Sequence, residues 1–301
     1  MKNTNKATMI GLTAIVLWSA IVGLIRSVSE QLGATGGAAM IYSVASVFLL
    51  LSVGFVRLSE FPRRYLLWGS VLFVTYELCL ALSIGYANTS QQAIEVAMVN
   101  YLWPTFTIVS AILFNRQKTS WLIVPGFVLS IVGICWVLGA AQGFSPASLV
   151  HNVLDNPLSY GLAFAGALIW AGYCTITARS ANGKNGVTLF FILVSVSLWI
   201  KYLLIGGAPM HFSTQSVVYL LLAAGAMGFG YAAWNVGILH GNVTILAGAS
   251  YFIPVLSAAL STLLLRTPLS LAFWQGAAMV SGGAILCWLA TRARPVATVT
   301  E

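Results

Sequence analysis

Long apolar runs separated by short polar segments make up almost the whole chain. Each run is about 20 residues long, which is the length a helix needs to cross the hydrocarbon core of a bilayer. Proline, glycine, asparagine and charged residues stand between the runs and mark connections. The pattern predicts ten membrane-spanning helices with short connections, at roughly 7–26, 36–56, 65–86, 92–114, 120–140, 158–178, 187–206, 216–238, 243–265 and 271–291.

Composition narrows the class of protein further. Of the 301 residues, 59% are hydrophobic and only 7% are charged, whereas a soluble domain carries about 25% charged residues. The Lys and Arg residues lie singly or in pairs between apolar runs, so the net charge of +8 forms no basic stripe. A soluble enzyme, a disordered chain and a nucleic-acid-binding protein are therefore excluded, and an all-α integral membrane protein surrounded by lipid is expected.

The placement of Lys and Arg predicts the orientation of the spans. With the N-terminus in the cytoplasm, ten crossings put most basic residues in cytoplasmic segments, including Arg292 and Arg294 near the C-terminus. Only Arg26, Lys201 and Arg266 fall on the other side, as the positive-inside rule requires. We expect both termini in the cytoplasm. The first run resembles a signal peptide, but it has no clear cleavage site after it, which favours a retained span.

The two halves of the chain repeat each other. Residues 100–104 (Asn-Tyr-Leu-Trp-Pro) match residues 250–254 (Ser-Tyr-Phe-Ile-Pro) at an offset of 150, and Trp18 matches Trp170 at an offset of 152. The first offset also relates Arg116 to Arg266, Gly126 to Gly276 and Gly133 to Gly283. The halves, 1–145 and 146–301, each hold five predicted spans, so the second half is inverted. Inverted repeats of this kind are typical of secondary transporters, with the binding site at the midplane between the halves.

Two carboxylates, Glu77 and Glu95, fall inside predicted spans. A charge at the bilayer centre costs at least about 2.5–3.5 kcal/mol on insertion scales, so such residues usually serve a function. Neither has an obvious Lys or Arg partner within the membrane, which favours binding of a cationic ligand group or protonation. The alternative is a structural carboxylate that is hydrogen-bonded to a neighbouring helix.

Proline and glycine mark candidate hinges. Pro104 and Pro254 interrupt equivalent helices, and each frees the backbone carbonyl four residues earlier, at Asn100 and Ser250. These positions are read either as hinges that expose polar backbone to a substrate or as static kinks. Gly228 and Gly230 permit bending or close helix packing in span eight.

Aromatic residues supply candidate binding surfaces. Tyr231, Trp234 and Asn235 lie at i, i+3 and i+4, which places them on one face of a helix. Of Tyr101 and Trp103, a regular helix directs only one toward a cavity, and we favour Tyr101 because Tyr251 is its repeat mate. Packing against neighbouring helices is the alternative for every ring. The other candidates lie deep in their spans: Trp18, Tyr76 and Trp170.

No motif indicates catalysis or a cofactor. The four cysteines lie within apolar runs without metal-ligand spacing, and there is no phosphate-binding loop. We expect no metal and no cofactor. A membrane enzyme acting on a lipid-linked substrate would need a catalytic constellation that the chain lacks, and a non-transporting membrane protein would leave the repeat and the carboxylates unexplained.

Three stretches carry a family resemblance: 92–104, 231–244 and Phe273–Gly276. Together with the five-plus-five repeat, they resemble the EamA branch of the drug/metabolite transporter superfamily, and more closely its YddG-type aromatic amino acid exporters of bacterial inner membranes. The resemblance covers essentially the whole chain. It implies export of phenylalanine, tyrosine, tryptophan and other neutral amino acids. It also implies a central cavity lined by spans 1, 3, 4, 6, 8 and 9, with bending half-helices as gates.

One departure from the family concerns a glutamate that many EamA proteins carry shortly after the proline-containing helix. Here these places read Phe114-Asn115-Arg116 and Leu265-Arg266-Thr267. No role of that glutamate is therefore carried over to this chain.

We therefore expect an inner-membrane amino acid exporter that works by alternating access around a central cavity. The aromatic residues would contact the substrate side chain, while Asn100, Asn235 and the freed carbonyls would hold its amino and carboxylate groups. Glu77 or Glu95 would bind the ammonium group or a proton. The alternative is a multidrug exporter of lipophilic or quaternary cations, in which the rings act as cation–π surfaces. A monomer suffices for either scheme.

Overall fold

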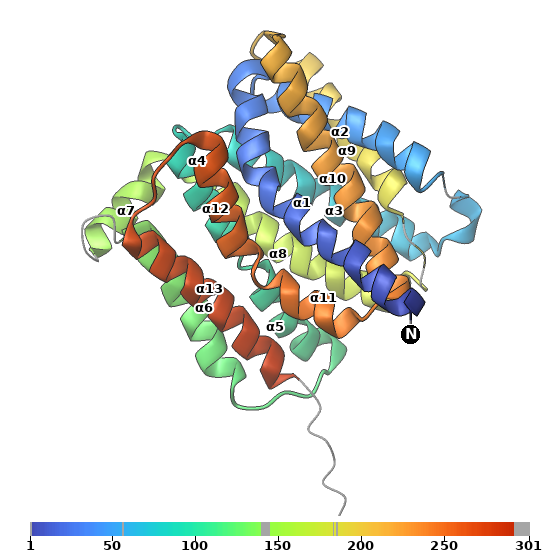
Figure 1. Ribbon diagram of the computed structural model, residues 1–301, viewed down its shortest axis with the longest axis vertical. Coiled ribbons are helices and arrows are strands. Elements are labelled where there is room, and N and C mark those ends of the chain that lie inside the picture. The colour runs from blue at the N-terminus through green and yellow to red at the C-terminus, as the bar shows by residue number, and fades with distance from the viewer. Residues whose placement is uncertain (1, 56, 140–144, 183, 185, 292–301) are drawn as a thin grey trace, which may run out of the picture.

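The computed structural model describes residues 2–55, 57–139, 145–182, 184 and 186–291, and every regular element within them is helical (Figure 1). The predicted C-terminal charges Arg292 and Arg294 lie outside the described residues. The helices are α1 (Lys2–Leu32), α2 (Ala34–Ser52), the 3-10 turn η1 (Leu58–Glu60), α3 (Arg63–Gly85), α4 (Ser90–Asn100), α5 (Trp103–Asn115), α6 (Ile123–Gly139), α7 (Pro146–Asp155), α8 (Pro157–Ser180), α9 (Val187–Ile205), α10 (Thr214–His240), α11 (Val243–Ser250), α12 (Ile253–Leu265) and α13 (Leu271–Ala290).

Two of the predicted spans are each broken into two helices. The predicted span 92–114 consists of α4 and α5, and 243–265 consists of α11 and α12. Both breaks lie two residues before the paired prolines, so Pro104 and Pro254 stand in the first turn of α5 and α12. A proline is well placed there. The N–H groups of the first helical turn have no acceptor within the helix, so the N–H that proline lacks is not needed.

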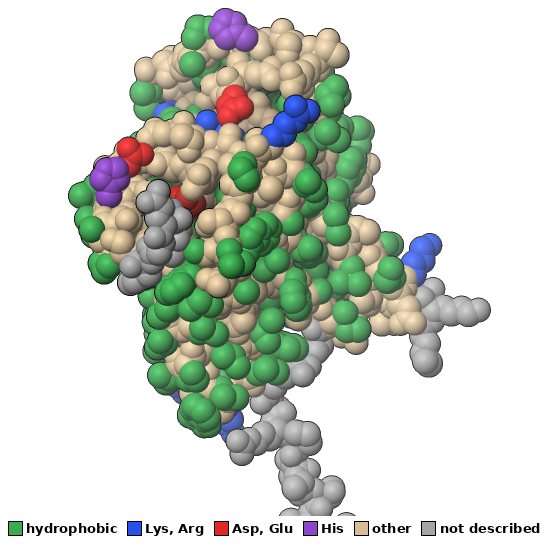
Figure 2. All heavy atoms as spheres, turned by 60° about the vertical axis from the view of Figure 1, so that its left-hand side comes forward, with side chains coloured by type: hydrophobic (Ala, Val, Ile, Leu, Met, Phe, Trp, Pro, Cys, Tyr) green, Lys and Arg blue, Asp and Glu red, His purple; other side chains and the backbone are tan. Residues whose placement is uncertain are grey.

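Apolar length marks most of the helices as membrane-spanning. Within the described residues, eight segments are long and apolar enough to cross a bilayer, with α4 and α5 counted together, and α6 and α12 are shorter apolar helices. Large apolar side chains such as Leu51 and Leu204 are 81% exposed, which lipid favours and water does not. Figure 2 shows a face whose middle is largely free of charged side chains, which gather near its ends.

The helices pack in antiparallel pairs (Figure 1). The most extensive pairs are α1 with α10, α6 with α13, α3 with α8 and α2 with α9. In the α6–α13 pair, glycines face each other: a Cβ at Gly133 would lie 2.9 Å from the carbonyl oxygen of Gly276, and one at Gly126 would lie 2.9 Å from that of Gly283. Only a residue without a side chain permits this approach, which membrane helix pairs commonly use.

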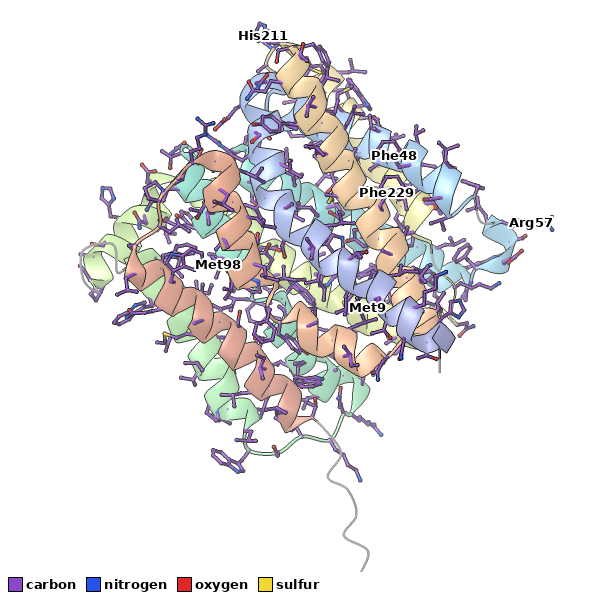
Figure 3. All side chains as sticks on the ribbon, viewed as in Figure 1. Met9, Phe48, Arg57, Met98, His211 and Phe229 are labelled. Atoms are coloured by element: carbon purple, nitrogen blue, oxygen red, sulfur yellow. The ribbon has the colours of Figure 1, made fainter. Side chains whose placement is uncertain are left out.

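Polar and aromatic contacts join α2 to its neighbours. The Ser43 and Ser195 hydroxyls lie 2.8 Å apart across the α2–α9 contact, and the Trp199 indole N–H donates to Ser43 over 2.9 Å. Phe48 of α2 and Phe229 of α10 stack with ring centroids 5.1 Å apart (Figure 3). Hydrogen bonds between polar side chains of neighbouring apolar helices contribute to helix association in a membrane.

Candidate functional site

A cavity of about 180 Å³ lies at the centre of the helix bundle. It is bounded by α1, α3, the α4–α5 break, α8, α10 and the start of α12, which correspond to the predicted spans 1, 3, 4, 6, 8 and 9. Its lining is Trp18, Ile21, Val22, Tyr76, Glu77, Leu80, Asn100, Tyr101, Trp103, Trp170, Cys174, Met227, Tyr231, Trp234 and Ile253. We call this the central cavity.

A second cavity of about 540 Å³ adjoins the first. The two share five lining residues: Trp18, Trp170, Cys174, Tyr231 and Trp234. The second also reaches Lys184 in the α8–α9 connection and Asn235 and Leu239 near the end of α10. We call this the vestibule. It is larger than the central cavity and reaches the ends of α8 and α10 on one side of the protein.

Two tryptophans line the central cavity, each in contact with other aromatic rings of its wall. Trp18 of α1 contacts Tyr231 and Trp234 of α10, with ring centroids 5.0 and 5.2 Å apart. Trp170 of α8 contacts Tyr76 of α3 with centroids 4.4 Å apart. Most of these rings meet at an angle, which suits aromatic quadrupoles. The walls therefore offer edges and faces of aromatic rings to whatever enters the cavity.

Glu77 is the only carboxylate among the lining residues of the central cavity. It is fully buried on α3, and two tyrosine hydroxyls donate to it: Tyr42 to Oε2 over 2.6 Å and Tyr231 to Oε1 over 2.7 Å. Among the described residues, the ion pairs are Arg26–Glu30 and Lys184–Glu60, so Glu77 has no basic partner there. Two charge-assisted hydrogen bonds offset part of the cost of burying the carboxylate and leave further lone pairs free.

Glu95 lies elsewhere. Its side chain on α4 accepts hydrogen bonds from Gln91 over 2.8 Å and from Tyr160 of α8 over 3.0 Å. It does not line either cavity. Its position fits the structural alternative considered above, a carboxylate that joins two helices, and leaves Glu77 as the carboxylate in the wall of the central cavity.

The break between α4 and α5 brings three predicted residues into the central cavity. Asn100, Tyr101 and Trp103 all line it. The expectation that only one of the two rings faces the cavity held for a regular helix, and here the chain leaves the regular helix between Tyr101 and Trp103. The Asn100 amide donates to the Ala163 carbonyl of α8 over 3.2 Å.

Four other predicted positions do not line the central cavity. Tyr251 is 7% exposed, packs against Trp288 of α13 with centroids 6.0 Å apart, and is not part of either cavity wall. Asn235 lines the vestibule but not the central cavity. α10 runs unbroken through Gly228 and Gly230. A Cβ at Gly230 would lie 2.7 Å from the Trp18 indole nitrogen, so this glycine makes room for a cavity wall.

Sequence reasoning missed Tyr42, which donates to Glu77 from outside the cavity. One signal could have found it: a tyrosine deep in an apolar span needs a partner for its hydroxyl, and few polar partners exist there. It also missed the aliphatic lining residues, for which the sequence gives no signal. These are Ile21, Val22, Leu80, Met227 and Ile253, together with Cys174.

The chemistry of the site is that of binding. One buried carboxylate faces a small cavity walled by tryptophan and tyrosine, with an amide at its edge. Within the described residues, no group of three or more His, Cys, Asp or Glu side chains could hold a metal ion. The cavity therefore suits a ligand that combines a cationic group with an apolar or aromatic part.

Known proteins resemble the chain over nearly its full length. It is 61% identical over 287 residues to the aromatic amino acid exporter YddG of Escherichia coli K12, covering 95% of this chain and 98% of that protein. It is 60% identical over 291 residues to the exporter of the same name from Salmonella typhimurium, covering 97% and 99%. A third, from Ancylobacter novellus, is 25% identical over 304 residues.

The fold is also known from experiment. A solved crystal structure superposes with a TM-score of 0.66 at 24% identity, covering 95% of this chain and 98% of its own. At this identity the likeness concerns the fold. No family model matches the chain.

Proposed function

The chain belongs to the YddG family of aromatic amino acid exporters of the bacterial inner membrane, and on that premise we propose that it exports phenylalanine, tyrosine and tryptophan through the central cavity. The observation that carries this proposal is the placement of Glu77. It is the one carboxylate in the wall of a cavity that is otherwise aromatic and aliphatic. An amino acid with a ring side chain has both of the groups that such a cavity binds.

In this scheme each part of the substrate meets a suitable group. The α-ammonium donates to the free lone pairs of Glu77, and the ring lies against the walls formed by Trp18 and Trp170. The Tyr76 hydroxyl and the Asn100 amide remain as donors for the α-carboxylate. Because the tyrosines that hold Glu77 occupy only one lone pair of each oxygen, they fix its orientation without blocking the substrate.

We further propose ten spans and two inverted repeats. The eight long spans, the short helix α6 and the α11–α12 pair add up to ten crossings, which places both termini on one side. Matched contacts support the repeats: Ser43 and Ser195, 152 residues apart, contact each other, and each of the α6 glycines faces the repeat mate of the other. A pseudo-twofold axis between the halves gives contacts of this kind, and alternating access uses the same symmetry.

The proposal is tested with purified protein in liposomes loaded with labelled phenylalanine. Glu77→Gln removes the charge but keeps the shape, so we expect efflux to fall at least about tenfold, since hydrogen bonds to charged groups contribute about 1.5–3 kcal/mol. Glu95→Gln is the matched control, because Glu95 is also a buried carboxylate bonded to a tyrosine but lies outside the cavity. Equal losses in the two variants would refute the assignment of Glu77.

The same assay shows whether protons are coupled to transport. If Glu77 only binds the ammonium group, wild-type efflux proceeds without an imposed proton gradient. Efflux that requires the gradient would make Glu77 the leading proton carrier. No efflux of phenylalanine in either condition, from protein shown to be folded, would refute export of aromatic amino acids.

A second candidate function, export of lipophilic cations, has an observation in its favour. The rings of Trp18, Tyr76, Trp170, Tyr231 and Trp234 surround a single carboxylate, an arrangement that also binds quaternary ammonium groups. Competition decides between one shared site and two. A quaternary cation that inhibits phenylalanine efflux in the wild type and loses this effect in Glu77→Gln shares the site.

A further inference from the structure

The central cavity lies between the vestibule and the α3–α4 turn. Along α1, Trp18 lines both cavities, Ile21 lines only the central cavity, and Arg26 lies beyond it. Along α3, Phe73 lines the vestibule and Glu77 the central cavity, and the helix then ends in the α3–α4 turn. We call the vestibule side the near end and the side of the α3–α4 turn the far end.

Arg26 holds the α3–α4 turn from one side. Its guanidinium donates to the Ala87 carbonyl over 2.5 Å and forms an ion pair with Glu30, one helical turn further along α1, over 2.8 Å. The Arg26 side chain is only 11% exposed, whereas that of Glu30 is 45% exposed. α1 is thus joined at the far end to the backbone of the α3–α4 turn.

The junction of α7 and α8 holds the same turn from the other side. Asp155 Oδ2 accepts from the Asn88 amide over 3.0 Å and from the Gln92 amide over 2.9 Å. The Asn156 amide donates to Gln92 Oε1 and to the Tyr86 carbonyl, each over 2.9 Å. Five side chains therefore hold the turn from its two sides, and we call them the polar lock: Arg26, Asn88, Gln92, Asp155 and Asn156.

The polar lock joins the two halves of the chain. Asn88 and Gln92 belong to the first proposed repeat, whereas Asp155 and Asn156 stand at the start of α8 in the second. Gln92 is 8% exposed and Asn156 is 9% exposed, so these two amides are shielded from solvent. Movement of one repeat against the other at this end must separate these partners.

We propose that the polar lock is the closed gate at the far end of the transport cavity, and that its opening exposes the central cavity on that side. This rests on the proposed transport by alternating access. Polar groups suit a gate because water replaces their hydrogen bonds when the gate opens, so the net change in free energy stays small. A fully apolar seal of the same area would lose its contacts without replacement.

The experiment measures access to the central cavity from each side, and it needs no substrate. Ile21→Cys is introduced into a variant without the native cysteines, and a membrane-impermeant maleimide is added to vesicles of each orientation. With the lock intact, we expect labelling from the near end only. Asp155→Ala removes the acceptor shared by Asn88 and Gln92, and we expect labelling from the far end to rise about tenfold.

Glu60→Gln is the matched control. It breaks the Lys184–Glu60 ion pair at the near end, which spans 2.9 Å between two partly exposed side chains. We expect no rise in far-end labelling, because this pair lies on the opposite side of the cavity. Unchanged far-end labelling in Asp155→Ala, or an equal rise in Glu60→Gln, would overturn the proposal.

A second reporter separates gate opening from unfolding. Cys287, kept as the single cysteine, is fully buried on α13, where it faces Gly126 of α6, and it should stay unlabelled in Asp155→Ala.

If Cys287 becomes labelled, the milder Asn88→Ala replaces Asp155→Ala, since Asn88 is exposed and its side chain loses only one hydrogen bond. We expect about a twofold rise for it, and no rise would overturn the proposal. Because labelling does not depend on phenylalanine efflux, failure of the lock and failure of the proposed function give different results.

Discussion

Tyr42→Phe tests how the buried carboxylate is held in place. The Tyr42 hydroxyl donates to Glu77 Oε2 over 2.6 Å, and its ring packs against Phe191 of α9 with centroids 5.4 Å apart. Tyr42 is fully buried and does not line the cavity. Phenylalanine keeps the ring and its packing, so the substitution removes one hydrogen bond and nothing that touches the substrate.

The expected magnitude follows from the charge of the acceptor. A hydrogen bond to a charged group contributes about 1.5–3 kcal/mol, and a buried acceptor without its donor carries the desolvation penalty as well. Because Tyr231 still holds Oε1, the carboxylate loses one of its two supports and can rotate. At 1.4 kcal/mol per factor of ten, we expect the KM for phenylalanine to rise about 10- to 100-fold, with a smaller change in kcat.

A double-mutant cycle isolates the interaction. Efflux kinetics and thermal unfolding are measured for Tyr42→Phe, Glu77→Gln and the double variant. If the hydroxyl acts through the carboxylate, Tyr42→Phe has much less effect in the Glu77→Gln background, since contacting residues are not additive. Equal effects of Tyr42→Phe in both backgrounds would refute the reasoning and make Tyr42 a packing residue alone.

Three further outcomes test the helix contacts. Gly276→Val should destabilise the protein by about 1–3 kcal/mol through overpacking against α6, whereas Gly172→Ala, with nothing within 4 Å of its added Cβ, should leave the unfolding temperature unchanged. Gly230→Ala should displace the Trp18 ring and raise the KM for phenylalanine severalfold, which efflux kinetics measure. Ser195→Ala should lower stability by about 0.6–1 kcal/mol, as expected for an interhelical hydrogen bond in a membrane; no loss in thermal unfolding would contradict the α2–α9 contact.

The positions of the helices could be predicted because the bilayer imposes one length on every span. Apolar runs located the long helices to within a few residues, apart from α1, which extends beyond its predicted span at both ends. α7 was missed because Pro146, at its first position, and Asp155, at its last, made the segment look like a loop. Its ten residues are also too short to produce a span signal.

The faces of the helices could not be predicted so well. In a soluble protein an apolar stripe marks the buried face, but a lipid-facing side is as apolar as the core, so no stripe forms. This is why Glu77 and Glu95 were equal candidates, although only Glu77 faces the central cavity. Tyr251 was expected to resemble Tyr101 because the two stand at matching positions of the sequence repeat. The repeat relates positions along the chain, but the neighbouring helix decides what each ring contacts.

The aromatic contacts in the wall of the central cavity form two matching pairs, whereas its carboxylate has no counterpart. Trp18 of the first half contacts Tyr231 of the second half, and Trp170 of the second half contacts Tyr76 of the first half. Glu77 directly follows Tyr76, but the residue after Tyr231 is an alanine, so the charge belongs to one repeat only. In the proposed alternating access, the paired rings exchange environments as the repeats move and keep an apolar wall in both states. In the same proposal, the single carboxylate fixes where the ammonium group binds and so sets the orientation of the substrate in the cavity.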